Sequence, residues 1–207
     1  MQYQSFSPRQ NATLFWWTKP EHQNRDGLIC DGSIRSGKTV SMAIGFIMWS
    51  MASFDKQNFA ICGRTIEALR RNVIVHIPTW LEGMFEVTER RSENKMVVTI
   101  GNRSNTYYLF GGRDESSYTL IQGITLAGVL FDEVALMPRS FVEQAMARCS
   151  VSGSKFLTSP ASLHLNSLAS NWVMGPMPHL PAMAASQLAE TLLPSGFTVP
   201  RPVITTL

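Results

Sequence analysis

The chain has 207 residues, of which 44% are hydrophobic and 16% are charged. This length and composition predict one or two folded domains with a sizeable core and argue against disorder throughout the chain. The net charge of +3 permits a polyanionic partner without requiring one. Three well-separated cysteines argue against a disulfide framework or a zinc ribbon and fit a reducing compartment.

Predicted strands and helices alternate in the first part of the chain. Short apolar runs predict strands over residues 27–31 and 58–62. Between them, small and apolar residues without proline predict a helix over 37–54. The apolar stretch over 39–54 has 16 residues, fewer than the roughly 20 that a membrane span needs, so we expect a buried helix of the core.

The next segment predicts an amphipathic helix over residues 64–75. Apolar residues recur there at helical spacing, while Arg70 and Arg71 face outward. We expect this helix to end before Pro78, because the residue that precedes a proline avoids helical backbone.

Residues 85–111 contain β-rich runs separated by polar turns, which predicts an inserted antiparallel meander. A continuous apolar run over 127–131 is typical of a strand buried on both faces. A helix that opens at Pro138 and a strand over 155–158 continue the alternation. The pattern predicts an α/β domain with a mostly parallel sheet flanked by helices.

A phosphate-binding motif lies between the first strand and the first long helix. Gly-Ser-Ile-Arg-Ser-Gly-Lys-Thr fits G-x-x-x-x-G-K-[ST] at every fixed position. Glycines let backbone N–H groups point inward around an anion, and the following helix adds the positive end of its dipole. Lys38 can reach the β- and γ-phosphates, and Thr39 can bind Mg²⁺. A glycine turn that merely caps a helix is the alternative. The expected phosphate loop comprises Gly32, Ser33, Ile34, Arg35, Ser36, Gly37, Lys38 and Thr39.

Two carboxylates, Asp132 and Glu133, follow the buried run over 127–131. In open α/β sheets, ligands bind at the carboxyl ends of the strands. We expect Asp132 to hold Mg²⁺, directly or through water, and Glu133 to polarise the attacking water. The pair could instead cap the next helix, but a phosphate loop 90 residues upstream favours the functional interpretation.

Other side chains give weaker signals. The Arg35 guanidinium could stabilise charge at the γ-phosphate, or it could be a solvated loop charge. The Gln10 amide matches the donor–acceptor edge of adenine, or it could be an ordinary surface residue. Thr158 ends a predicted strand, where its hydroxyl could sense the γ-phosphate. The arginines that could meet DNA phosphates, or serve only as solvated charge, are Arg64, Arg70, Arg71, Arg90 and Arg91.

The composition changes near residue 160, which predicts a domain over 1–160 and an atypical tail over 161–207. Residues 158–207 contain only two charged side chains but seven of the 11 prolines. Proline cannot donate to a β-ladder, so a central strand there is improbable. We expect at most one short helix, over 182–193, in a loosely ordered segment.

Taken together, the motifs resemble the N-terminal ATPase domain of a phage terminase large subunit. They are Ser-Pro-Arg-Gln ahead of the phosphate loop, the loop itself, Cys-Gly-Arg-Thr-Ile-Glu-Ala-Leu-Arg over 62–70, and the stretches over 122–138 and 140–150. The resemblance covers residues 5–160 and is most specific over 122–150.

The resemblance implies a RecA-like P-loop NTPase that uses ATP and Mg²⁺. It assigns adenine contact to Gln10, the loop arginine to Arg35, metal binding to Asp132 and water activation to Glu133, with the phosphates on the loop. It also implies double-stranded DNA as the substrate, a portal protein and a terminase small subunit as partners, and a homo-oligomer on a procapsid in the host cytoplasm.

Two features depart from the family pattern. The coupling motif usually reads Thr-x-Asn-Pro or Cys-Asn-Pro, whereas residues 157–160 read Leu-Thr-Ser-Pro, with Ser159 in place of the asparagine. Family members also carry an RNase H-like nuclease domain. Two-metal cleavage needs several carboxylates, and the tail has one, Glu190, so we expect no nuclease in this chain.

These observations predict the ATP-hydrolysing motor domain of a DNA-packaging terminase. A frameshifted or degenerate prophage gene would explain the unusual tail. Two alternatives stay open: an inactive nucleotide-binding remnant, and another P-loop enzyme such as a helicase-type ATPase. A small kinase would need a lid and an acceptor pocket, for which the sequence gives no signal.

Overall fold

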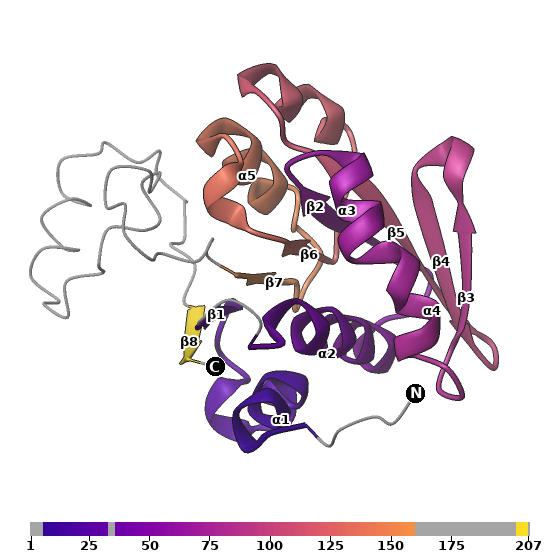
Figure 1. Cartoon of the computed structure of the whole chain (residues 1–207), viewed down its shortest axis with the longest axis vertical. Helices are drawn as coiled ribbons and strands as arrows, with labels where there is room; N and C mark the ends of the chain where they lie inside the picture. The colour runs from indigo at the N-terminus through magenta and orange to yellow at the C-terminus, as the bar shows by residue number, and fades with distance from the viewer. Residues whose placement is uncertain (1–5, 33–35, 160–201, 207) are drawn as a thin grey trace, which may run out of the picture.

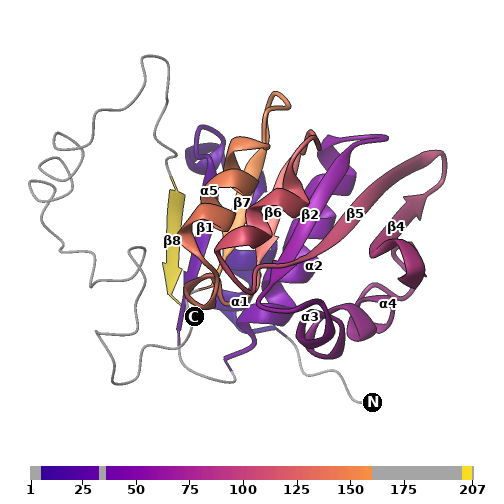
Figure 2. The same cartoon turned by 90° about the horizontal axis from the view of Figure 1, so that it is seen from above.

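A single mixed β-sheet organises the described part of the chain, which comprises residues 6–32, 36–159 and 202–206 of a computed structural model (Figure 1, Figure 2). Its eight strands follow the order β3-β4-β5-β2-β6-β7-β1-β8. Pairing is antiparallel from β3 to β5 and parallel from β5 to β8. The strands are β1 (Gly27–Asp31), β2 (Asn58–Gly63), β3 (Glu86–Arg90), β4 (Lys95–Ile100), β5 (Arg103–Gly111), β6 (Gly128–Phe131), β7 (Lys155–Thr158) and β8 (Pro202–Thr206).

Helices cover both faces of this sheet. One buried cluster joins α2, α3 and α4 to one face, and a second joins α5 to the other (Figure 1). The α-helices are α1 (Pro8–Leu14), α2 (Lys38–Ser53), α3 (Ile66–Asn72), α4 (Ile77–Trp80) and α5 (Arg139–Ala147). The 3₁₀ turns are η1 (Trp16–Thr18), η2 (Pro20–His22), η3 (Ile74–His76), η4 (Arg91–Glu93), η5 (Glu115–Ile121) and η6 (Val134–Leu136). The expected α/β architecture is confirmed.

Helix α2 forms the centre of the larger core. Phe46 of this helix is fully buried and meets the ring of Phe59 on β2 edge-on, at 5.7 Å between centroids. Phe59 in turn stacks on Tyr107 of β5 at 5.2 Å. In the described residues, no helix is both long and apolar enough to cross a membrane, and the apolar length of α2 is used in this packing.

The single helix expected over 64–75 is wrong in its details. Helix α3 ends at Asn72, and the 3₁₀ turn η3 and the short helix α4 follow. Three successive β-branched residues, 73–75, resist helical side-chain rotamers and mark the break. The helix does end before Pro78, as predicted, but the proline is not the cause. Pro78 lies in the first turn of α4, where its missing N–H costs nothing.

The predicted antiparallel meander is confirmed by β3, β4 and β5. It is not a separate insertion, however, because β5 also pairs in parallel with β2 from Asn58 to Gly63. The meander therefore extends the central sheet outward, and β3 forms its edge (Figure 1).

The expectation that the tail contains no strand is wrong for residues 202–206. They form β8, which pairs in parallel with β1 along its whole length. Pro202 is the first residue of an edge strand, a position where proline is tolerated because it breaks no central ladder. The other residues of the tail, including the helix expected over 182–193, lie outside the described residues.

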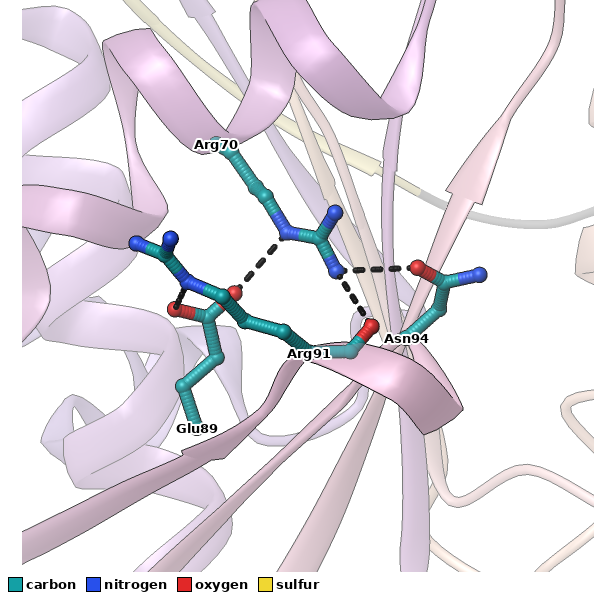
Figure 3. Close-up of polar contacts among 4 residues, drawn as sticks. All are labelled: Arg70, Glu89, Arg91 and Asn94. Carbon is teal, nitrogen blue, oxygen red and sulfur yellow. Dashed lines mark hydrogen bonds and ion pairs between the residues drawn. The ribbon is translucent and has the colours of Figure 1, made fainter.

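Arg70 does not simply face solvent, as its place on the predicted helix implied. Its guanidinium joins α3 to the β3–β4 hairpin (Figure 3). Nε donates to Glu89 at 2.8 Å, and the same guanidinium donates to the side chain of Asn94 at 2.9 Å and the carbonyl of Arg91 at 3.0 Å. Because both partners in the Arg70–Glu89 ion pair are about three-quarters buried, the pair is shielded from water.

We predict that Arg70→Gln lowers the free energy of unfolding by about 1–2 kcal/mol, because three charge-assisted hydrogen bonds to the hairpin are lost. Arg71→Gln is the matched control, since Arg71 is exposed and, among the described residues, its side chain bonds only the adjacent Asn72. The control should change stability by less than about 0.5 kcal/mol. Urea denaturation measures both, and equal losses in the two variants would show that the network does not anchor the hairpin.

Candidate functional site

The carboxyl ends of four central strands meet at one edge of the sheet. Strands β1, β7, β6 and β2 lie side by side in parallel, so their carboxyl ends lie at the same edge of the sheet. Thr158 at the end of β7 is in register with Ile29 of β1 and with Phe131 of β6, and Phe131 is in register with Cys62 of β2. The phosphate loop after β1 and the acidic pair after β6 are thereby brought to the same edge.

The phosphate loop leads directly into α2. Gly37 is the N-cap of this helix, in the left-handed region at φ 81°, which favours glycine. Lys38 begins the helix, and its Nζ donates to the carbonyl of Gly32 at 2.6 Å, so the side chain folds back across the loop. The expected site residues Ser33, Ile34 and Arg35 lie outside the described residues.

Thr39 and Asp132 face each other although 93 residues separate them. The Thr39 hydroxyl donates to Oδ1 of Asp132 at 3.3 Å. The backbone N–H of Asp132 donates to the carbonyl of Cys62 at 2.8 Å, which ties the end of β6 to β2. The arrangement brings a hydroxyl and a carboxylate together at the start of α2, and both are oxygen ligands of the kind that Mg²⁺ accepts.

The pKa of Asp132 is raised to about 6, chiefly by burial and also by the adjacent Glu133 carboxylate, while the Thr39 hydrogen bond acts in the opposite direction. A divalent cation would offset both unfavourable effects. No cluster of three or more His, Cys, Asp or Glu side chains occurs among the described residues. Most of the ligands of a Mg²⁺ ion at Asp132 would therefore be phosphate and water oxygens.

Glu133 is exposed and has a left-handed backbone, with φ 57° and ψ 61°. This conformation is costly for a non-glycine residue, so neighbouring contacts must hold it. The hydroxyl of Ser159 accepts from the Glu133 N–H at 3.3 Å, and the Ser159 carbonyl accepts from the Val134 N–H at 3.0 Å. Ser159 is 2% exposed, so these bonds are shielded from water. Sequence reasoning singled out Ser159 only as a departure from a motif and missed this contact.

Thr158 and Gln10 are two further expected site residues that the structure describes. Thr158 is buried, and its hydroxyl makes a long hydrogen bond of 3.5 Å to the Ser159 carbonyl. Its contact with a γ-phosphate stays a prediction. The Gln10 amide lies against the loop, with Nε2 donating to the Ser36 carbonyl at 2.8 Å. Its contact with adenine also stays a prediction.

We predict that the buried Asp132 makes the free energy of unfolding of the metal-free chain depend on pH. Its raised pKa means that the folded state binds the proton more tightly than the unfolded state, so the free energy of unfolding falls as pH rises from about 4 to about 6. Asp132→Asn removes this contribution and should be more stable than the parent at pH 7, by on the order of 1–2 kcal/mol. Urea denaturation with a chelator between pH 4 and 7 tests this. If the free energies of unfolding of parent and variant change with pH in parallel, the predicted effect of Asp132 is contradicted.

Comparisons with known proteins identify the family of this chain. The family model for the N-terminal part of the terminase large subunit, T4likevirus-type, matches residues 29–175. No curated protein matches the chain. The structure of the large terminase from a thermophilic bacteriophage is similar, with a TM-score of 0.72 and 52% identity over 76% of this chain and 39% of that chain. The same terminase in complex with ADP gives a TM-score of 0.71 and 50% identity, over 75% and 39% of the two chains.

A more distant similarity concerns the fold alone. The ATPase domain of the Thermus phage P74-26 large terminase matches with a TM-score of 0.53 and 18% identity, over 79% of this chain and 72% of that chain. This chain spans about two-fifths of the length of the first terminase, which is 52% identical to it. Its mostly parallel sheet with flanking helices is the RecA-like P-loop fold. From the family match and the identity to that first terminase, the chain belongs to the phage terminase large subunits and corresponds to their N-terminal domain.

Proposed function

We propose that this chain binds and hydrolyses Mg-ATP as the motor domain of a viral DNA-packaging terminase. The observation that carries the proposal is the contact between Thr39 and Asp132, which joins the phosphate loop to the acidic pair at 3.3 Å. The similar terminase from a thermophilic bacteriophage has been crystallised with ADP and with ATP-γ-S, which supports nucleotide binding by a related chain.

The residues at the loop fit a bound triphosphate. The hydroxyl of Ser36 is buried and has no hydrogen-bond partner among the described residues, so it is available to a ligand oxygen. The N-terminus of α2 at Lys38 presents backbone N–H groups and a positive dipole end to an anion. Lys38 adds a point charge that would move from the Gly32 carbonyl to the phosphates.

Thr39 and Asp132 would hold the magnesium ion, with Asp132 binding directly or through water. When bound, Mg²⁺ supplies positive charge that offsets the negative charge on the β- and γ-phosphates. Glu133 lies one residue beyond Asp132, is exposed, and would orient the attacking water and accept its proton. In this proposal Arg35, or an arginine of a neighbouring subunit, neutralises the charge that develops on the γ-phosphate.

The proposed role in packaging includes double-stranded DNA as the substrate. It also includes assembly of several copies on a procapsid in the host cytoplasm, with a portal protein and a terminase small subunit as partners. Family membership supports each of these.

One experiment distinguishes this function from two others. Mg-ATP binding and phosphate release by the purified chain are measured without DNA, with double-stranded DNA and with single-stranded DNA. A motor domain binds ATP and releases phosphate, and DNA increases the rate. An inactive remnant binds nucleotide without turnover. A helicase-type ATPase would respond to single-stranded DNA instead. The Ser159 substitution makes the remnant a specific alternative, because the family's coupling asparagine is absent.

We predict that Lys38→Ala lowers ATP affinity by at least about tenfold, because the loop loses its ammonium contact with the phosphates. Isothermal titration with Mg-ATP measures the change. Lys19→Ala is the control, since Lys19 is exposed and follows the 3₁₀ turn η1 rather than the phosphate loop. Unchanged affinity in Lys38→Ala would overturn the phosphate-loop assignment.

We predict that Glu133→Gln retains ATP affinity within about twofold and lowers phosphate release by about 100-fold or more, because an amide keeps the shape but cannot accept the proton from water. Single-turnover phosphate release measures the effect, with Glu82→Gln as an exposed control remote in sequence. Hydrolysis at the parental rate would show that Glu133 is not the general base.

A further inference from the structure

Strand β1 is held differently at its two ends. Its first three residues, 27–29, are paired on both sides, with β7 on one side and β8 on the other. Among the described residues, its last two, Cys30 and Asp31, pair only with β8. Strand β7 ends at Thr158, and the next residue bonds to β6 and to the turn that follows β6. The end of β1 that carries the phosphate loop is therefore held by β8 in the described sheet (Figure 2).

The last residues of β1 lead directly into the nucleotide site. Oδ1 of Asp31 accepts from the backbone N–H of Gly32 at 2.7 Å, which ties the end of the strand to the first residue of the phosphate loop. The Gly32 carbonyl in turn accepts from Nζ of Lys38 at 2.6 Å. The place of the Asp31 backbone therefore sets where the loop begins and where the lysine folds across it.

Strand β8 provides the ladder at this end of β1. Thr205 and Thr206 pair in parallel register with Cys30 and Asp31. Helix α1 lies beside β8, and the buried hydroxyl of Thr13 on this helix is 3.8 Å from the sulfur of Cys30. Backbone groups that lose a ladder partner must bind water instead, which allows the end of a strand to fray. Without β8 we therefore expect the end of β1 to open.

We propose that β8 is a positioning element for the phosphates, which acts through Cys30 and Asp31 and holds the base of the phosphate loop. The inference rests on the proposed function, since it concerns the same nucleotide site. Loss of the β8 ladder would leave the loop less ordered before binding, so nucleotide affinity would fall by the cost of ordering it. Glu133 follows β6 rather than β1, so turnover of bound ATP should not change.

A double substitution to proline, Ile204→Pro with Thr205→Pro, tests the role of this ladder. The N–H groups of successive residues in a strand point to opposite edges, so one of the two faces β1, and proline removes it. Ile204→Val with Thr205→Val is the conservative variant, because it keeps both donors. Thr88→Pro is the matched control, since β3 is the edge strand at the other side of the same sheet.

Isothermal titration with Mg-ATP measures affinity, steady-state phosphate release gives KM and kcat, and thermal unfolding checks folding. For the double proline variant we expect a roughly fivefold to tenfold loss of affinity, the size that follows from the loss of about one backbone hydrogen bond. Its KM should rise, with kcat within about twofold of the parent. Amide hydrogen exchange at Cys30 and Asp31 should become faster. The valine variant and Thr88→Pro should keep the parental affinity, although Thr88→Pro should melt earlier.

Three results would overturn the proposal. If the double proline variant melts earlier but binds Mg-ATP as the parent does, β8 only stabilises the sheet. If Thr88→Pro loses the same affinity, the loss reflects the stability of the whole sheet. If exchange at Cys30 and Asp31 stays slow in the proline variant, β8 does not hold the end of β1.

A second variant covers the case in which the double proline chain does not fold. Ile204→Gly with Thr205→Gly keeps both donors but lowers the strand propensity of β8, and the same expectations apply to it. A parent chain that does not bind Mg-ATP would contradict the proposed function itself, and the positioning role with it.

Discussion

The parallel alignment of β1, β7, β6 and β2 is the constraint on which the site depends. In a parallel sheet every strand ends at the same edge, so residues far apart in sequence can meet there without long side chains. Here this brings Thr39 within 3.3 Å of Asp132 across 93 residues. The hydrogen bond from the Asp132 N–H to the Cys62 carbonyl also holds the backbone of Asp132 against the end of β2.

The site combines groups that are costly in the absence of a ligand. Asp132 is a largely buried carboxylate whose pKa is raised to about 6, and Glu133 keeps a left-handed backbone that only neighbouring contacts can hold. The Ser36 hydroxyl is buried without a partner in the described part of the chain. A magnesium-bound triphosphate would satisfy the carboxylate and the hydroxyl together. In the absence of a ligand, the hydrogen bond from the Glu133 N–H to the buried Ser159 hydroxyl holds the left-handed backbone of Glu133 in place.

Local patterns were enough to predict most of the strands and helices around the site. The phosphate loop follows from the spacing of its glycines and lysine, and β6 follows from a continuous apolar run, because both signals are carried by neighbouring residues. The break after Asn72 also had a local signal, the β-branched residues over 73–75, which the periodicity of the helix concealed. The order of strands and helices along the chain could also be predicted, because each element has a pattern carried by neighbouring residues.

Contacts between distant segments could not be predicted in this way. Strand β8 depends on the free edge of β1, which no local pattern reveals. The hydrogen bonds from Gln10 to Ser36 and from Glu133 to Ser159 depend on how α1 and β7 pack against the sheet edge. Arg70 looked like a solvated helix charge because its partners on the hairpin are 19 to 24 residues away. Tertiary packing determines all four of these features: the strand, the two hydrogen bonds and the contacts of Arg70.

A crystal structure of this chain with Mg²⁺ and ATP-γ-S would test the central claim most directly. The account predicts that the phosphates lie at the N-terminus of α2, that the Thr39 hydroxyl leaves Asp132 to bind the metal, and that Asp132 lies beside the metal or one of its waters. A nucleotide bound elsewhere, or a Thr39–Asp132 hydrogen bond that persists with no metal between the two side chains, would contradict it.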